Sequence, residues 1–546
     1  MRDCTQPIGN VAPLERRWVV SFSVFALALT SVPYLVGWAA AGDGWHFSGF
    51  VFGVEDGNSY IAKMLRGAHG AWLFQLSYSA ESHPVALMFL FHILLGKLAG
   101  LLFGTQDVLR LHSALVFVYH FARVVVGIVL LLVSYRFLAE FLQSVRLRRI
   151  GLVLVAFGGG LGWIAVLMRA PGLTLDFYSP EAFTFLTLYG LPHLAAARAL
   201  WLAALLLYWS SVRTKSLRPA WGAGGLWLGV ALIQPFYVAL LYVLLVLHVG
   251  FLWLRAFTQN NWEQRRFAGR AFKFGIVASL PSLPIVLYTV YLFQSDPVYR
   301  QWSNQNLILS PPSLDYLIGW GLLLLPALLG LRGLRRRHEL VWSWALVWLL
   351  ALPLLLYAPF NLQRRSSEAI QLPLIGLALH GIFIGGGRYR NVRKRWGPLL
   401  LLAMLLPSSA LLLIGGTLAL SRPTEPLFIR QSQADVFACL ADTLPGGSIV
   451  LSRYEIGNPL PAYAPLVSYI GHGPETVFLA EKRIAVEKFF DIDSPSGGRI
   501  VWWHENGSPA LVTSRLASEL DLAHEEYELH WQIICTNQDF AAYAPR

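Results

Sequence analysis

Charged residues are scarce in this 546-residue chain, at 14% of the total, against about 25% in an average soluble protein. Hydrophobic residues account for 55%. Apolar runs of about 18 residues or more recur along the chain, and each is long enough to cross the hydrocarbon core of a bilayer. This composition excludes an ordinary soluble enzyme and predicts a mainly α, polytopic membrane protein.

Acidic residues are scarcest in the first three quarters of the chain. Residues 1–420 hold 34 Lys and Arg but only 15 Asp and Glu, whereas residues 421–546 hold 9 and 16. The net charge of +12 therefore sums a basic and an acidic region, and it does not indicate a nucleic-acid partner. The break predicts a membrane domain over 1–420, with its first outer loop at 42–112, and an extracytoplasmic domain over 421–546.

Apolar runs and basic clusters together predict the topology. The runs lie at 18–41, 84–103, 113–140, 150–168, 193–211, 221–254, 274–293, 313–331, 339–358, 369–387 and 397–420. The positive-inside rule places the basic clusters between them in the cytoplasm. Parity then requires 221–254 to form a hairpin of two short helices, broken at Gln234-Pro235, and 84–103 not to cross fully, as an outer-face or re-entrant helix. We expect about eleven crossings in a bacterial cell membrane, with a cytoplasmic N-terminus and the C-terminal domain outside.

From residue 425 onward the composition is that of a soluble domain. Helical and strand patterns alternate there, which predicts a small α/β domain. The expected elements are helices over 431–444 and 474–490 and strands over 448–452, 466–470 and 527–536. Cysteine is rare, with three in the chain, and Cys439 and Cys535 both lie in this region. Because an exported domain tolerates disulfides, a bond between them and two separate buried thiols are both open.

Two of the few acids of the membrane domain, Glu55 and Asp56, are adjacent and follow the first apolar run. An amphipathic stretch over 61–76 comes after them and is suited to the membrane interface. A carboxylate at that position can act as a general base toward a hydroxyl or ligate a divalent cation. A solvated turn that caps the next helix is the alternative.

A second candidate is the arginine pair Arg364-Arg365, because the charge pattern predicts few cations on the outer face. Arginine forks match phosphate oxygens bidentately, which predicts a phosphate site. Pairing with Glu368 or with lipid headgroups is the alternative.

A third candidate is the outer loop at 169–192 with the residue that follows it: Asp176, Glu181 and His193 are residue types that can complete a metal or acid site. Helix capping and turn formation are the simpler explanation for them. Arg123 and Arg198 lie in or near apolar runs, where a cation is costly in lipid, so we expect both to face a polar cavity.

An ordered set of short motifs spans about 60 residues of the first outer loop. It comprises Asp56, Tyr60, Lys63-Met64-Leu65, His83-Pro84, Leu102-Phe103-Gly104 and Arg110-Leu111-His112-Ser113-Ala114. This set resembles the GT-C superfamily of polytopic glycosyltransferases, which includes protein O-mannosyltransferases and the lipid A aminoarabinose transferase. The chain departs from the family pattern where the second acid falls on Gly57 and the lysine on His83. Segments 455–463 and 471–476 resemble the tails of bacterial members.

The resemblance implies a membrane glycosyltransferase that moves a sugar, with inversion, from a polyprenyl-phosphate donor to an acceptor hydroxyl on the outer face. The acceptor would be a glycan, a lipid or a protein. Asp56 takes the catalytic position, with Glu55 as a substitute, and Tyr60 follows in the same motif. The donor phosphate would be bound by Arg364, Arg365, His83 and Arg110. No cofactor is implied with certainty, and a divalent cation is left open.

The alternative function is a lipid-linked glycan flippase or transporter, or a protein like an O-antigen polymerase or ligase. Transporters commonly show internal repeats and helices broken at the midplane of the membrane. The sequence shows no convincing repeat, and its acids lie at the membrane surface. Both observations favour the enzyme.

Overall fold

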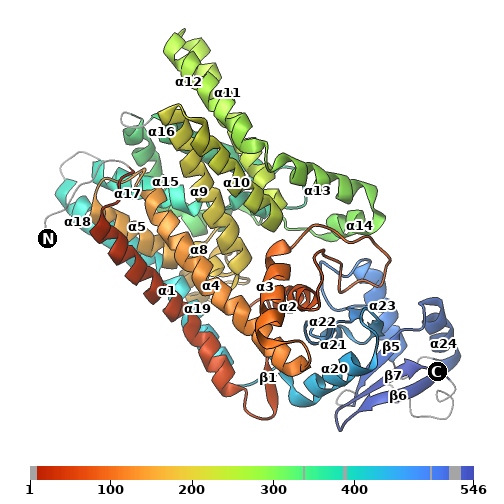
Figure 1. Ribbon diagram of the computed structural model, residues 1–546. Helices are drawn as coiled ribbons and strands as arrows, with labels where there is room; N and C mark the ends of the chain where they lie inside the picture. Colours follow the sequence, from red (N-terminus) through yellow and green to blue (C-terminus); the bar gives the residue numbers. More distant parts are fainter. Residues whose placement is uncertain (1–8, 336–338, 385–389, 492–494, 516–529) are drawn as a thin grey trace. The chain divides into compact units, whose positions relative to one another are not determined.

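The computed structural model describes residues 9–335, 339–384, 390–491, 495–515 and 530–546. It is mainly helical (Figure 1). Packing divides the chain into two compact units, each built from separate segments. Unit 1 comprises Met1–Val32, Ala122–Tyr291 and Leu307–Gly415, and unit 2 comprises Pro33–Phe121, Leu292–Asn306 and Gly416–Arg546. The boundary predicted at residue 420 divides the chain by location, membrane against extracytoplasmic, whereas the two units are divided by packing. The boundary at 420 therefore stays a prediction.

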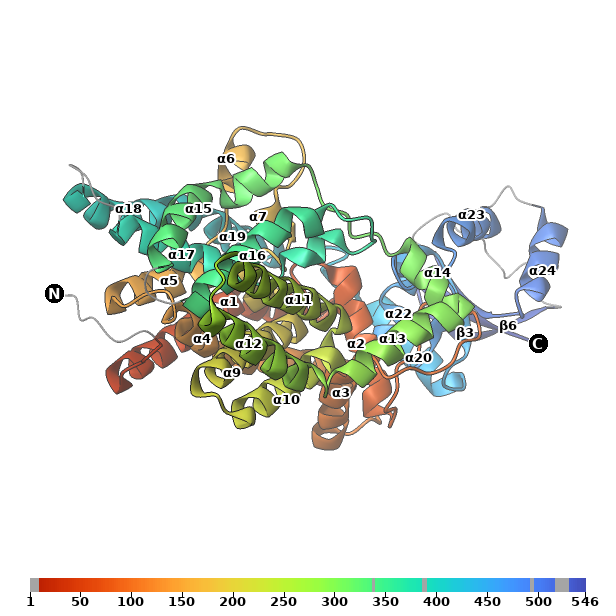
Figure 2. The same ribbon diagram turned by 90° about the horizontal axis from the view of Figure 1, so that it is seen from above.

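Unit 1 is a helical bundle. Its helices are α5 (Val145–Phe157), α6 (Gly162–Leu167), α7 (Leu175–Tyr178), α8 (Thr184–Gly190), α9 (Pro192–Thr214), α10 (Leu217–Ile233), α11 (Pro235–Thr258), α12 (Trp262–Ser279), α15 (Ser313–Leu334), α16 (Glu339–Leu356), η1 (Gln363–Ser367), α17 (Gln371–Ile384) and α18 (Arg390–Leu405). Helices α9, α10 and α12 lie side by side (Figures 1 and 2). Helices α1 (Pro13–Ala40), α4 (Val108–Leu138), α13 (Leu283–Ser295) and α19 (Pro407–Leu420) contribute to both units.

Seven helical segments among the described residues are long and apolar enough to cross a membrane, or eight if the pair α12 and α13, bent by 62°, counts as one span. The chain is therefore an integral membrane protein, but the expected count of about eleven crossings is not confirmed. The run at 221–254 is broken at Gln234-Pro235 as expected, with α10 ending at Ile233 and α11 beginning at Pro235. Proline disfavours helical geometry in the residue before it and fits the first position of a helix.

The run at 84–103 forms a short helix, α3 (Leu90–Phe103). Its 14 residues span only about 21 Å at 1.5 Å per residue, less than the roughly 30 Å of a hydrocarbon core. Helix α3 packs closely on α2 (Val54–Ala68) because glycines face the partner backbone: a Cβ on Gly96 would collide with the carbonyl of Met64, and one on Gly67 with that of Ile93. These lengths favour the prediction that α3 does not cross the membrane.

Unit 2 contains a five-stranded mixed sheet in the order β4-β3-β5-β7-β6. The strands are β3 (Ile449–Leu451), β4 (Val467–Ser468), β5 (Ala510–Ser514), β6 (Trp531–Thr536) and β7 (Phe540–Pro545). Strand β3 is parallel to both neighbours, whereas β7 is antiparallel to β5 and β6. A separate antiparallel pair joins β1 (Trp45–Phe47) of the first outer loop to β2 (Phe428–Arg430) of the tail. The predicted small α/β domain is thus present.

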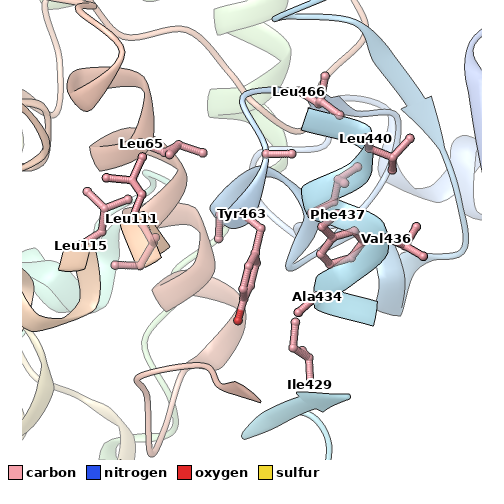
Figure 3. Close-up of a cluster of buried hydrophobic side chains, with 14 of the residues drawn as sticks. Leu65, Leu111, Leu115, Ile429, Ala434, Val436, Phe437, Leu440, Tyr463 and Leu466 are labelled. Atoms are coloured by element: carbon pink, nitrogen blue, oxygen red, sulfur yellow. The ribbon is translucent and has the colours of Figure 1, made fainter. Parts of the chain in front are cut away.

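The helices of unit 2 come from the first outer loop, a later loop and the tail. Besides α2 and α3 they are α14 (Pro297–Gln305), α20 (Gln431–Thr443), α21 (Tyr454–Gly457), α22 (Leu460–Tyr463), α23 (Leu479–Phe490) and α24 (Ser496–Glu505). Leu65 and Leu111 contribute to the same apolar cluster as Phe437 and Tyr463 (Figure 3). A disulfide joins Cys439 of α20 to Cys535 of β6, which decides between the two states that the sequence leaves open.

One helix boundary in the tail differs from the prediction. The helix expected over 474–490 begins only at Leu479, because Gln305 of α14 donates from its side chain to the carbonyls of Pro474 (3.1 Å) and Thr476 (2.6 Å). Both carbonyls thus accept hydrogen bonds from a side chain of another helix. The sequence patterns also miss β5, β7 and α24, and part of the strand expected over 527–536 lies outside the described residues.

Candidate functional site

The acid pair stands in the first turn of α2, where carboxylates are favoured by the helix dipole. Gly53 precedes the helix in the left-handed conformation (φ 58°) and turns the chain into it. The Asp56 side chain is 58% exposed. Gly57, which takes the place of the family's second acid, is buried, and a Cβ there would collide with the Phe50 ring. An acid therefore does not fit at position 57 unless Phe50 moves.

The tail supplies partners for both acids. The Tyr454 hydroxyl donates to Glu55 Oε2 at 2.9 Å. In a loop at residues 471–476, here called the tail loop, His472 Nε2 lies 3.3 Å from Asp56 Oδ1. Burial raises the pKa of Tyr454, and the charge of Glu55 raises it further, so the phenol stays protonated and donates. The acid motif and the tail loop, both noted in the sequence, form one cluster.

The tail loop also forms a buried ion pair with α2. Glu475 Oε1 of the tail loop accepts from Lys63 Nζ at 2.6 Å and from the Ser59 hydroxyl at 2.7 Å. Lys63 also donates to Ser59. Burial alone would raise the pKa of Glu475, but the charge of Lys63 and the hydrogen bonds from Lys63 and Ser59 outweigh it and lower that pKa. Glu475 is therefore ionised at neutral pH and anchors the tail loop to α2.

Neutral hydrogen bonds extend the same contact along α2. The Asn58 amide donates to Asn458 Oδ1 at 2.8 Å, and the Asn458 amide donates to the Gly471 carbonyl at 2.7 Å. The hydroxyl of Ser79 donates to the Glu475 carbonyl at 2.7 Å. Buried polar groups are stabilising only when paired in this way, so the arrangement is specific.

The remaining candidate residues of unit 2, Tyr60, His83 and Arg110, have contacts other than those of the acid pair. Tyr60 is half-buried and stacks on His92, with ring centroids 4.8 Å apart. His83 Nδ1 lies 2.7 Å from the Glu81 carbonyl and its Nε2 accepts from the Leu76 amide at 3.0 Å. Both nitrogens are thus used within the loop, and the predicted phosphate contact of His83 is not available in this conformation. Arg110 is exposed in the first turn of α4.

In unit 1 a second buried ion pair organises the outer loops. Arg198 of α9 donates to both carboxylate oxygens of Glu368, at 2.5 and 2.9 Å, and both side chains are fully buried. It also donates to the carbonyls of Pro180 (2.8 Å) and Glu181 (3.0 Å). The prediction that Arg198 faces a cavity is therefore wrong, because carboxylate and carbonyl oxygens pack against it.

Arg123 likewise donates inside the bundle, to Thr30, Ser31 and the Leu188 carbonyl. Its polar partners are therefore groups of neighbouring helices, and the expected polar cavity is not what surrounds it.

The arginine pair faces Glu181. Arg364 Nε lies 4.0 Å from Glu181 Oε2, and Arg365 Nε lies 3.9 Å from Oε1. The side chains of Arg364 and Arg365 are 22% and 26% exposed, and the Arg364 guanidinium stacks over the Tyr178 ring at 5.0 Å. Two cations thus share one carboxylate at long range. Glu368, the partner considered from sequence, is occupied by Arg198.

Asp176 has a structural role. Its buried carboxylate accepts from the amides of Gly160 (2.9 Å) and Gly162 (3.1 Å) and from the Thr174 hydroxyl (2.5 Å). His193 is a buried residue at the start of α9. Among the described residues no three His, Cys, Asp or Glu side chains are grouped to hold a metal. The bonds of Asp176 agree with the simpler explanation for this loop, in which these residues cap and turn the chain.

No protein-family model and no curated protein sequence matches this chain. Its structure is similar to that of the apo oligosaccharyltransferase of Archaeoglobus fulgidus, with 14% identity, a TM-score of 0.55, and coverage of 92% of this chain and 70% of that one. It is also similar to the arabinofuranosyltransferase AftD from Mycobacteria, with 16% identity, a TM-score of 0.54, and coverage of 97% and 41%. The chain has the GT-C fold. The resemblance stated from the first outer loop is thus confirmed.

Other structures with the GT-C fold carry ligands. The Archaeoglobus oligosaccharyltransferase AglB has been solved with an inhibitory peptide and a dolichol-phosphate (TM-score 0.51), and with Zn and sulfate (TM-score 0.52); identities are 13% and 12%. Sequence reasoning missed His472, Tyr454 and Glu475 of this chain. The only signal for His472 and Glu475 was the likeness of segment 471–476 to bacterial members, which names no role, and Tyr454 lies outside both tail segments.

Proposed function

We propose that the protein is a glycosyltransferase that moves a sugar from a polyprenyl-phosphate donor to an acceptor hydroxyl on the outer face of the membrane. The observation that carries this proposal is Asp56: an exposed carboxylate in the first turn of α2, held by the tail, in a chain with the GT-C fold. The AglB complex with dolichol-phosphate supports a lipid-phosphate donor. About eleven crossings with the tail outside would give these groups access to the outer leaflet.

In the proposed mechanism Asp56 takes the proton of the acceptor hydroxyl as that oxygen attacks the anomeric carbon. The bond between this carbon and the phosphate oxygen breaks on the opposite side, which inverts the configuration and releases polyprenyl phosphate. Arg364 and Arg365 would bind the phosphate and stabilise the charge that develops on it. Their single shared carboxylate, Glu181, leaves an excess of positive charge for this purpose. Arg110 is an additional candidate because it is exposed, whereas His83 is omitted.

A divalent cation is compatible with the fold, since AglB has been solved with Zn. The described residues group no set of three metal ligands, so no step is derived through a metal.

The test is sugar transfer by the purified full chain in lipid nanodiscs, supplied with radiolabelled undecaprenyl-phosphate sugars and a lipid extract as the source of acceptor. We expect Asp56→Asn to lower kcat by about 10²- to 10⁴-fold, the usual contribution of general base catalysis. Glu55→Gln is the matched control, since it removes the adjacent charge, and we expect a loss below about tenfold. Wild-type rates in Asp56→Asn would remove Asp56 from the mechanism.

A further inference from the structure

The imidazole of His472 lies between two groups of opposite hydrogen-bonding character. Its Nδ1 accepts from the backbone N–H of Glu475 at 3.2 Å, and its Nε2 lies 3.3 Å from Asp56 Oδ1. The side chain is only 3% exposed. A ring nitrogen that accepts from an N–H carries no proton itself, so in the neutral ring the proton is on Nε2. Nε2–H then donates to the Asp56 carboxylate.

The backbone that sets this tautomer is itself fixed. Glu475, whose amide occupies His472 Nδ1, is held by Lys63 and Ser59 of α2. The Thr476 hydroxyl accepts from the amides of Gly471 (3.3 Å) and His472 (3.2 Å), closing the tail loop on itself. The Tyr78 ring lies against the imidazole, with centroids 5.2 Å apart. The ring therefore has a rigid surround and a defined donor direction.

We infer that His472 is a positioning residue for Asp56: its Nε2–H holds one carboxylate oxygen, so that the carboxylate keeps a single orientation toward the acceptor hydroxyl. The inference rests on the proposed function, which makes Asp56 the general base. It assigns to the tail a part in the chemistry, because the positioning group lies 416 residues from the acid it holds. His472 does not relay the proton, since its second nitrogen is occupied by the Glu475 amide.

Two variants of His472 and one control separate the effect of the Nε2–H group from the effect of the bulk of the ring. His472→Leu keeps an apolar side chain but has no N–H, and we expect kcat to fall about ten- to hundredfold with the donor KM unchanged, as for loss of a hydrogen bond to a charged group. His472→Gln retains an amide N–H and should recover most of kcat. Tyr469→Phe is the control, because it removes another hydrogen bond of the tail, to Asn506, and should change kcat less than twofold.

The pH profile gives a readout that a purely structural role would not move. A hydrogen bond donated to a carboxylate favours its charged form, so in His472→Leu the acid limb of kcat should move to higher pH, and in His472→Gln it should stay. The titratable groups around this site are Glu55 from α2, Tyr78 from the first outer loop, and Tyr454, His472 and Glu475 from the tail. The same change of His472 made in the Asp56→Asn protein should cost nothing further.

A cross-linking experiment tests the contact without using activity. In a Cys4→Ser background, with Cys439 and Cys535 joined to each other, Asp56→Cys and His472→Cys should be linked by a short bifunctional thiol reagent. If they are not linked, the contact is absent and the inference is overturned whatever the activity. If wild type is active and His472→Leu is equally active with an unmoved pH profile, only the inference fails. If wild type transfers no sugar from any donor tested, the proposed function fails, and the role of His472 with it.

Discussion

Each unit has one buried ion pair beside its candidate functional group, and the comparison shows how such a group is held. In unit 1 the pair is Arg198–Glu368, and Arg198 also binds the Glu181 carbonyl. In unit 2 the pair is Lys63–Glu475, and the Glu475 amide binds His472. In both units the buried pair fixes the backbone of a loop, and that loop presents a side chain to a more exposed group.

The two units differ in the sign of the exposed charge. The loop of unit 1 presents one carboxylate, Glu181, to two arginines, so positive charge is in excess. The loop of unit 2 presents the imidazole of His472 to Asp56, which stands beside a second acid, Glu55, so negative charge is in excess. An excess of positive charge suits a phosphate, and an excess of negative charge suits a base that accepts a proton. In both units a buried ion pair and the loop that it fixes thus hold the candidate group, although the two groups have opposite charge.

The largest expected effect comes from breaking the buried pairs. Lys63→Met leaves Glu475 buried without its cation, and Arg198→Leu does the same to Glu368. Each should lower the free energy of unfolding by about 3–5 kcal/mol, measured by thermal unfolding in detergent. Lys488→Met, at an exposed lysine of α23, should have almost no effect. If only one of the two variants is destabilised, the two buried ion pairs do not contribute equally to stability.

A smaller effect is expected from the charge excess of unit 1. Arg364→Ala should raise the donor KM about tenfold, since a charge-assisted contact of about 1.4 kcal/mol is lost. Glu181→Gln should act in the opposite direction and lower the donor KM by about twofold to fivefold, because the partly exposed arginines lose their competing carboxylate. An increase of KM in Glu181→Gln would mean that the acid orients the arginines.

The smallest effect is a pH dependence confined to unit 2. Because the folded pKa of Glu475 is lowered from 4.5, its contribution to stability is complete above about pH 5 and is lost as the pH falls through 4.5 toward the folded value. Wild type should therefore lose its advantage in Tm over Glu475→Gln as the pH falls below about 5, by about 2–4 °C for each kcal/mol. An advantage that does not change with pH would show that Glu475 is not held ionised.

Local chemistry made several features predictable from the sequence. The break between α10 and α11 lies at Gln234-Pro235 because proline restricts its own and the preceding residue wherever it occurs. Helix α20 and strand β3 lie where their periodicity predicts. Asp56 was identifiable as a candidate because acids are rare in residues 1–420.

The partners of the candidate residues were not predictable in this way. Asp176 has a suitable residue type for a metal, but two loop amides occupy it. Glu368 was considered for Arg364 and Arg365, yet Arg198, 170 residues away in sequence, takes it. Which carboxylate meets which cation depends on helix packing, and neither periodicity nor composition carries that information.

The sequence by itself determined that the chain is a membrane protein and singled out Asp56 as a candidate, since charge content and hydrophobic run length report directly on the solvent around each segment. Tertiary structure alone decided which groups hold that carboxylate. Contacts between α2 and the tail join residues about 400 positions apart, and Gln305 of α14 holds the tail loop through the carbonyls of Pro474 and Thr476. The tautomer of His472 and the ionised state of Glu475 follow from that placement, because each is set by a neighbour that the chain brings in from far away.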